Sequence, residues 1–214
     1  MLVGRVDPNQ PLKVMHEDTE VLDGAFAEQR DLVSVVIGEN VKHIDGFTFF
    51  GCYNLIELYN LSSVKDNLPG FASVVHTSLD EPSVLINKGD YYFYYDDDEE
   101  AYYLGAYVGS ETVLDLPSDV DGFSYRLRSG AFGRSTTITS VRVPAGVKGI
   151  DRQAFYEMSK LETVYFDVTT GWMGVNQSTK EPYALESTQV SDAAQMAVTL
   201  RIVPASWGGM YRED

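Results

Sequence analysis

The sequence predicts an α/β fold of the solenoid type, a right-handed coil with short parallel strands on one wall and short helical turns on the other. Three observations predict it. A phenylalanine recurs at intervals of 23 residues, apolar residues recur at fixed distances from it, and apolar and polar positions alternate in the segment that follows each phenylalanine. An inserted antiparallel β segment interrupts the repeat, and a carboxy-terminal cap follows it.

The repeat is anchored by Phe26 and Phe49, which are 23 residues apart, and by Phe132 and Phe155, which have the same spacing. Five further columns stand at offsets −5, +6, +9, +11 and +15 from each phenylalanine. With the phenylalanines included, 22 of these 24 positions are apolar, whereas a hydrophobic content of 44% predicts about 11. Such self-similarity at a fixed period is the signature of stacked structural repeats.

Each repeat unit predicts one strand, a turn and a short helical segment. The residues at +9 and +11 alternate with polar or mixed neighbours, which is the period of a strand. The phenylalanine, the small residue before it and the apolar residue at +6 fit one or two helical turns. Because a single unit cannot bury its own apolar side, the units are expected to stack in register as a solenoid.

Segments 25–37, 49–55 and 131–144 resemble the repeat AFxxCxxLxxVxIPxxVxxI of BspA-like leucine-rich repeat proteins. Only Cys52 keeps the cysteine of that motif, and only Pro144 keeps its proline. Segments 77–83 and 103–112 resemble a β segment inserted in some members, and 164–172 resembles the start of a recurrent carboxy-terminal module. The resemblance implies a leucine-rich repeat solenoid. It also implies an extracellular or cell-surface location, because many members are exported and implicated in attachment to host or bacterial partners.

The insertion accounts for the 83 residues between Phe49 and Phe132, where three periods would give 69. Short apolar and aromatic runs at 84–86, 91–95, 101–108 and 113–116, separated by Gly/Asp loops, predict an antiparallel meander. The last run is expected to re-enter the strand wall. The spacing from Leu116 to Leu127 is four residues longer than in other repeats, which predicts a bulging loop around residues 121–123.

At the carboxyl end, Asp192 and Gln195 form a capping-box pattern that predicts the start of a helix. The apolar residues at 193, 196, 197 and 200 share one face of it, and Val203-Pro204 should end it. The apolar residues Trp207, Met210 and Tyr211 are expected to cover the last repeat. At the other end, Leu12 and Val14 occupy strand positions of a truncated repeat, so the natural chain is expected to continue upstream.

We therefore expect a single leucine-rich repeat domain over residues 1–214. Its parts are amino-terminal repeats at 12–65, the β-rich insertion at 66–126, carboxy-terminal repeats at 127–170 and a capping module at 171–214.

Composition excludes several classes of function. The net charge is −16, with a sequence pI near 4.4, which argues against binding to nucleic acid or to anionic lipid. A single cysteine excludes an internal disulfide, and no apolar run approaches the ~18 residues of a membrane span. The amino terminus lacks the pattern of a signal peptide. Either an intracellular protein or a processed part of a longer exported one fits these observations.

Candidate reactive residues favour no catalytic, cofactor or metal site. His16, His43 and His76 have no zinc-ligand spacing, and Cys52 is expected to be an inert core thiol. The acidic run 96–100 lacks the alternation of a calcium loop, so a charged turn that protects the hairpin is preferred over a calcium site. Tyr91–Tyr95 predicts one packed strand face and one exposed face of phenol rings suited to sugar or peptide contact.

The candidate binding surface is the outward side of the strand wall, at offsets +8 and +10. Stacked side chains there form the ladder that solenoids commonly use for binding. An exposed sheet face that binds nothing is an equally open interpretation. The eight outward residues are Ser34, Val36, Glu57, Tyr59, Ser140, Arg142, Thr163 and Tyr165.

The preferred hypothesis is a non-enzymatic binding or adhesion module, without cofactor, that recognises a protein or glycan partner and is a monomer that does not insert into membranes. One alternative is a structural spacer in a longer surface protein. A second is a glycosidase-type enzyme, which would need two carboxylates about 5 to 10 Å apart.

Overall fold

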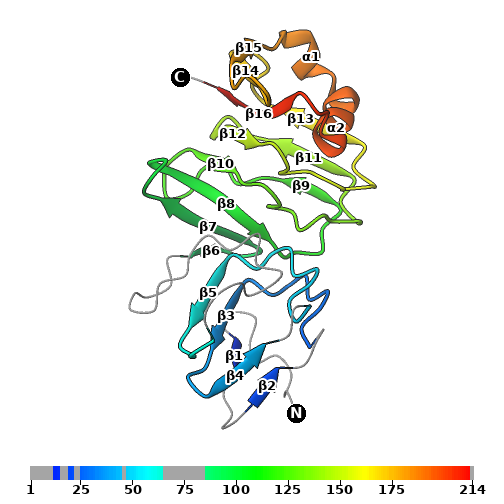
Figure 1. The fold of residues 1–214 in the computed structure, drawn as a ribbon. Coiled ribbons are helices and arrows are strands. Elements are labelled where there is room, and N and C mark those ends of the chain that lie inside the picture. Colours follow the sequence, from blue (N-terminus) through cyan, green and yellow to red (C-terminus); the bar gives the residue numbers. More distant parts are fainter. Residues whose placement is uncertain (1–11, 15–18, 22–24, 45–46, 65–84, 213–214) are drawn as a thin grey trace. The chain divides into compact units, whose positions relative to one another are not determined.

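The computed structural model describes residues 12–14, 19–21, 25–44, 47–64 and 85–212 (Figure 1). Its contacts divide the chain into two compact units, Met1–Val84 and Leu85–Asp214, which we describe separately. The single domain over 1–214, with its four parts, stays a prediction. His16, His76 and residues 66–84 of the insertion lie outside the described residues.

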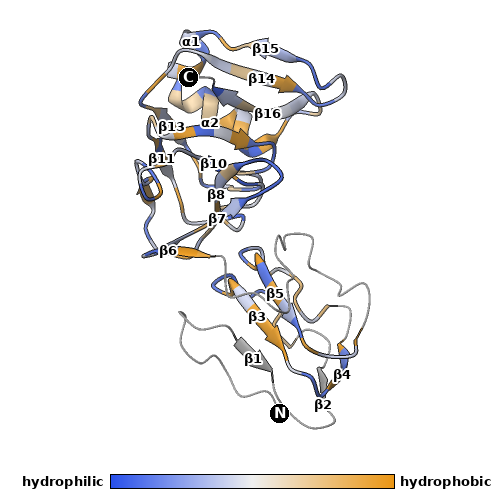
Figure 2. Cartoon of the chain, turned by 90° about the vertical axis from the view of Figure 1, so that its left-hand side faces the viewer, coloured by the Kyte–Doolittle hydropathy of each residue, from blue (hydrophilic) through white to orange (hydrophobic). Residues whose placement is uncertain are grey.

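The first unit is built from two parallel sheets. β1 pairs with β3 and β3 with β5, while β2 pairs with β4. In β3 the hydrophobic residues stand out along the strand (Figure 2). The side chains of Val35, Ile37 and Leu58 are buried. The strands are β1 (Leu12–Val14), β2 (Thr19–Val21), β3 (Ser34–Ile37), β4 (Val41–Ile44) and β5 (Glu57–Asn60).

The second unit contains the remaining strands and both helices of the described chain. The strands are β6 (Ile86–Lys88), β7 (Tyr91–Asp96), β8 (Ala101–Tyr107), β9 (Val113–Asp115), β10 (Tyr125–Leu127), β11 (Ser140–Val143), β12 (Val147–Asp151), β13 (Thr163–Phe166), β14 (Trp172–Asn176), β15 (Pro182–Ala184) and β16 (Trp207–Arg212). The helices are α1 (Ser187–Ser191) and α2 (Ala193–Ile202).

Two β walls enclose the core of the second unit. One wall is the parallel sheet β9–β11–β13, and the other is an eight-stranded sheet in the order β15-β14-β16-β12-β10-β8-β7-β6 (Figure 1). Within that larger sheet β8, β10 and β12 are parallel neighbours. Side chains from both walls, such as Val141 and Leu127, belong to one buried cluster. The chain therefore coils from one β wall to the other.

The predicted helical wall is wrong for the described repeats. Each anchoring phenylalanine accepts a hydrogen bond at its carbonyl from the N–H three residues later, as in Cys52 to Phe49 at 3.1 Å and Ser135 to Phe132 at 2.9 Å. The third residue of each of these turns has a left-handed backbone. These residues are Glu28 (φ 63°), Gly51 (φ 78°), Arg134 (φ 53°) and Glu157 (φ 60°). A left-handed residue cannot continue a right-handed helix, so the chain makes β-turns there instead.

The phenylalanine column is confirmed within each unit. The rings of Phe26 and Phe49 stack with centroids 5.2 Å apart, and those of Phe132 and Phe155 with centroids 4.9 Å apart. All four side chains are buried. The 23-residue spacing thus places equivalent rings on top of one another, as the repeat predicts.

The predicted antiparallel meander is confirmed for β6, β7 and β8. β9 also re-enters the strand wall as expected, by parallel pairing with β11. The parallel pairing of β8 with β10 was not predicted. A register irregularity between Tyr92 and Phe93 and the burial of Tyr92, Phe93 and Tyr94 overturn the expectation of one exposed tyrosine face. Only Tyr95 of this run is exposed.

The predicted helix at the carboxyl end is confirmed as α2. The Asp192 carboxylate accepts a hydrogen bond from the backbone N–H of Gln195, and Val203 ends the helix in a left-handed conformation. Met196, Ala197 and Leu200 are buried, and α2 packs against β13. β16 runs antiparallel to β12, with Trp207 and Met210 in the core. Coverage of the last repeat by these residues stays a prediction.

Phe132→Ala should lower the free energy of unfolding of the second unit by about 3–5 kcal/mol, because it opens a cavity beside Phe155. Both tryptophans, Trp172 and Trp207, lie in this unit, so urea unfolding followed by tryptophan fluorescence measures the change. The matched control Val113→Ala, at a site that is 61% exposed, should change it by less than about 0.5 kcal/mol. A loss below about 1 kcal/mol for Phe132→Ala would contradict the stacked column.

Candidate functional site

Two outward rows cross the strand wall of the second unit. Parallel pairing aligns Asp115 of β9, Arg142 of β11 and Tyr165 of β13 in one row. It aligns Val113, Ser140 and Thr163 in the next row. Side chains between these positions, such as those of Val141 and Val164, are buried, so strand alternation turns the two rows outward. We call these six residues the β9–β11–β13 ladder.

Polar contacts fix the ladder in place. Arg142 donates hydrogen bonds to both carboxylate oxygens of Asp167, at 2.7 and 3.3 Å, and this partner raises the pKa of the guanidinium. Thr163 Oγ1 donates to Ser140 Oγ at 2.8 Å. The Tyr165 side chain is 54% exposed beside Arg142. The ladder therefore offers an oriented cation, a phenol and hydroxyls on one surface.

The four predicted site residues of the first unit do not form an equivalent surface. Ser34 and Val36 are half-buried, whereas Glu57 is fully buried and Tyr59 is 8% exposed. The Glu57 carboxylate accepts a hydrogen bond from Ser34 Oγ at 2.6 Å and another from Tyr59 Oη at 2.7 Å. The exposure predicted for Glu57 and Tyr59 is therefore wrong. Their polar groups can be buried because they pair with one another.

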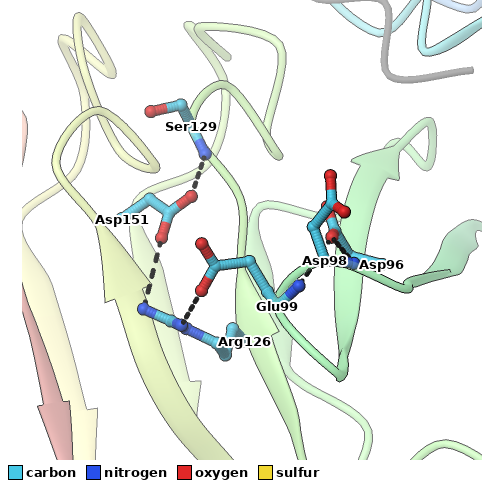
Figure 3. A network of polar contacts seen from close by, with 6 residues as sticks. All are labelled: Asp96, Asp98, Glu99, Arg126, Ser129 and Asp151. Carbon is cyan, nitrogen blue, oxygen red and sulfur yellow. Dashed lines mark hydrogen bonds and ion pairs between the residues drawn. The ribbon is translucent and has the colours of Figure 1, made fainter.

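A charged network lies on β8, β10 and β12 and includes the tip of the β7–β8 hairpin (Figure 3). Arg126 contacts Glu99 at 3.5 Å and Asp151 at 4.0 Å, and its guanidinium lies over the Tyr103 ring at 5.4 Å. The Ser129 N–H donates to Asp151 at 3.4 Å. Burial raises the pKa of Asp151, although Arg126 and Arg128 oppose that shift. The network holds Arg126 in one orientation.

Gly149 makes room for this arginine. A Cβ at Gly149 would lie 2.5 Å from Nε of Arg126, closer than real side-chain contacts allow.

The acidic run 96–100 takes part in the network through Glu99, and Asp96 accepts hydrogen bonds from the N–H groups of Asp98 and Glu99 (Figure 3). This agrees with a hydrogen-bonded charged turn. Within the described residues no group of three or more His, Cys, Asp or Glu side chains is arranged to hold a metal ion.

An open pocket of about 510 Å³ adjoins the network, and sequence reasoning did not find it. Its aromatic lining comes from Tyr95, Tyr102 and Phe123. Its polar lining includes Glu100, Arg126 and Lys148. Phe123 lies in the loop that the long spacing before Leu127 predicts, which was the one available signal. A second groove of about 690 Å³ lies between α2 and the segment 159–162.

These two pockets do not support the glycosidase alternative. The first is lined by one carboxylate, that of Glu100, and the second by one, that of Glu162. A glycosidase mechanism requires two carboxylates facing each other across the substrate.

Among the helices of the described chain, none has the length and apolar character needed to cross a bilayer.

The profile of the BspA type leucine rich repeat region matches six copies over residues 19–100 and 115–177. The chain belongs to this family. A leucine rich cell surface protein from Faecalibacterium prausnitzii A2-165 is a structural match with 11% sequence identity and a TM-score of 0.20. The match covers 74% of this chain and 60% of that one. A comparison with curated proteins finds no match.

The family's motif cysteine survives at Cys52, where it is a buried structural thiol. Its Sγ donates a hydrogen bond to the carbonyl of Phe26 at 2.9 Å, and burial raises the pKa of the thiol to about 11. The thiolate is the nucleophile and the metal ligand, so a raised pKa makes this cysteine unreactive. His43 is exposed, as expected for a surface histidine.

Alkylation of Cys52 at pH 8 should be at least about 100-fold slower in the folded chain than in urea. A pKa about two units above the ordinary value lowers the thiolate fraction by that factor, and burial slows access further. The measurement is iodoacetamide labelling followed by mass spectrometry. Equal rates in the two states would show that the thiol is not in the core.

Glu57→Ala should destabilise the first unit by about 1–3 kcal/mol, because it leaves the buried hydroxyl of Tyr59 and the half-buried hydroxyl of Ser34 without their acceptor. The urea dependence of Cys52 labelling reports this unit specifically, since Cys52 is the only cysteine. Glu39→Ala, at an exposed position of the same unit, is the control and should change little. Equal effects of the two substitutions would mean that Glu57 is solvated.

Proposed function

We propose that this chain is a non-enzymatic recognition module of a bacterial surface or secreted protein, and that it binds a protein or glycan partner through the β9–β11–β13 ladder. Membership in the BspA type repeat family supports the repeat-module part of this proposal. The surface location follows from the family resemblance, since many such proteins are exported and implicated in attachment. The module acts without a cofactor and as a monomer.

The observation that carries the proposal is the exposed pair Arg142 and Tyr165 at the same level of neighbouring strands. Arginine and tyrosine are enriched among the residues that dominate binding energy in interfaces. Both supply a large contact area, and each ends in a polar group. Asp167 already orients the guanidinium of Arg142. The arginine therefore loses less side-chain entropy when a partner binds to it.

The ladder also has the geometry of an extended binding site. Its rows repeat at the spacing between strands, so successive contacts on a partner would meet equivalent positions. Val113, which is 61% exposed, adds an apolar contact next to the hydroxyls of Ser140 and Thr163. A surface of this kind suits a partner that lies across the three strands.

The double variant Arg142→Ala/Tyr165→Ala should bind at least about 30-fold more weakly to a partner selected from arrays of extracellular proteins and glycans, because such anchors contribute about 2 kcal/mol or more. Its melting temperature should barely change, since both side chains are exposed and solvent screens the ion pair of Arg142 with Asp167. Surface plasmon resonance and thermal denaturation are the two measurements.

The matched control is Arg134→Ala/Tyr183→Ala. Arg134 contacts Glu157 at 2.6 Å, as Arg142 contacts Asp167, and Tyr183 is an exposed tyrosine away from the ladder. This variant should retain full binding. Full retention by the Arg142/Tyr165 variant would remove the ladder as the binding surface, and arrays without any signal would favour the spacer alternative.

A further inference from the structure

The loop between β9 and β10 is held by hydrogen bonds and exposes the ring of Phe123. Val120 and Phe123 exchange two backbone hydrogen bonds, at 2.9 and 3.0 Å, around the turn Asp121-Gly122. Both turn residues have positive φ, 53° and 86°, as in the tightest hairpin turns. The Asp119 carboxylate accepts a hydrogen bond from the Gly122 N–H, and this bond lowers the pKa of Asp119. The loop therefore has one well-defined shape.

The turn is also tied to the meander. Lys88 of β6 contacts the Asp121 carboxylate at 2.5 Å. The loop nevertheless leaves the Phe123 side chain 58% exposed. Burial of a large apolar side chain is favourable, so a ring that is held in place and left exposed is available for contact with a ligand.

Phe123 is the end of a continuous row of three partly exposed rings. Its centroid lies 5.3 Å from that of Tyr102, with the ring planes 28° apart. Tyr102 in turn lies 4.9 Å from Tyr95, with the planes 63° apart. The pairing of β7 with β8 sets the second contact, since Tyr95 and Tyr102 are register partners. Two strands and one loop thus supply a single aromatic surface.

Hydrogen-bond donors and a hydrogen-bond acceptor border this aromatic surface. Lys148 is the extra residue of a bulge in β12, where the register with β10 shifts between Tyr125 and Arg126. Bulges of this kind commonly redirect a side chain beside a binding site. Arg126 is held by Glu99 and Asp151 (Figure 3). Glu100 supplies a carboxylate to the pocket. The pocket thus offers donors and an acceptor around exposed rings.

We propose that this aromatic pocket, formed by Tyr95, Tyr102 and Phe123 with Glu100, Arg126 and Lys148, is a glycan-binding site that takes one or two pyranose rings. It is distinct from the β9–β11–β13 ladder, and the proposal does not depend on binding there.

The chemistry of the pocket matches a sugar. The C–H face of a pyranose is apolar and packs on aromatic rings, while its hydroxyl groups both donate and accept hydrogen bonds. Lys148 and Arg126 can donate to them, and Glu100 can accept from them. The volume of about 510 Å³ lies in the range of about 300–1,000 Å³ that is typical of small-ligand sites. Because the cations Arg126 and Lys148 line the pocket, it can bind acidic sugars as well as neutral ones.

The test is an array of neutral, N-acetylated and uronic-acid oligosaccharides probed with the full chain, followed by calorimetry of the strongest soluble oligosaccharide. Phe123→Ala and Tyr95→Ala should each weaken that binding by roughly tenfold, since an aromatic contact contributes on the order of one power of ten to an equilibrium constant. Phe123→Trp, which keeps an aromatic face, should restore it. Both positions are exposed, so the two alanine variants should fold with unchanged tryptophan fluorescence.

The control is Tyr183→Ala, which removes an exposed tyrosine that belongs neither to the pocket nor to the ladder and should leave glycan binding unchanged. Absence of any glycan signal for the unmodified chain would overturn the proposal. Loss of glycan binding in Tyr165→Ala with full retention in Phe123→Ala would also overturn it and would assign the glycan to the ladder. Selective binding of peptides that Phe123→Ala abolishes, without glycan binding, would replace the sugar by a peptide.

Discussion

The structure depends on a match between two spacings. Neighbouring strands in a sheet lie about 4.7–4.9 Å apart, and the stacked phenylalanine rings have centroids 4.9 and 5.2 Å apart. Rings anchored one repeat apart can therefore stack while the strands beside them keep their hydrogen bonds. A single repeat has no other way to bury its apolar side. The 23-residue spacing is the sequence property that satisfies both requirements in these two pairs of rings.

The left-handed residue two positions after each phenylalanine determines how the repeat turns. It ends the turn after a few residues, so the segment that follows the phenylalanine forms no helix before the next strand begins, as between Phe132 and β11. With strands in both walls, neighbouring repeats stay close together on both sides. The outward side chains then contact each other directly, as Thr163 and Ser140 do at 2.8 Å. The same turn geometry therefore builds the core and aligns the candidate binding surface.

The sequence predicts the parts of this fold that rest on spacing and alternation. The phenylalanine columns, the antiparallel meander, the return of β9 to the wall and the helix that begins after Asp192 all follow from local patterns. The left-handed turns could not be predicted, because Glu28, Arg134 and Glu157 have no special preference for that conformation and only Gly51 gives a signal.

The candidate sites were harder to predict than the fold. The period indicates which face of a strand a residue occupies, but not whether that face is covered. The exposure of Glu57 and Tyr59 was predicted wrongly for this reason. The aromatic pocket depends on the long-range pairing of β8 with β10 and on a bulge at Lys148, neither of which leaves a pattern in one sequence.

The reversal of strand direction at β12 has a consequence for self-association. On one side β12 pairs with β10 in parallel, as one repeat pairs with the next, but on the other side β16 of the same chain runs in the opposite direction. Repeats with open, like-directed edges can join end to end with copies of themselves into fibres. At this edge the hydrogen-bonding groups that would template another copy are already used, so stacking of identical molecules onto β12 is blocked by the chain itself.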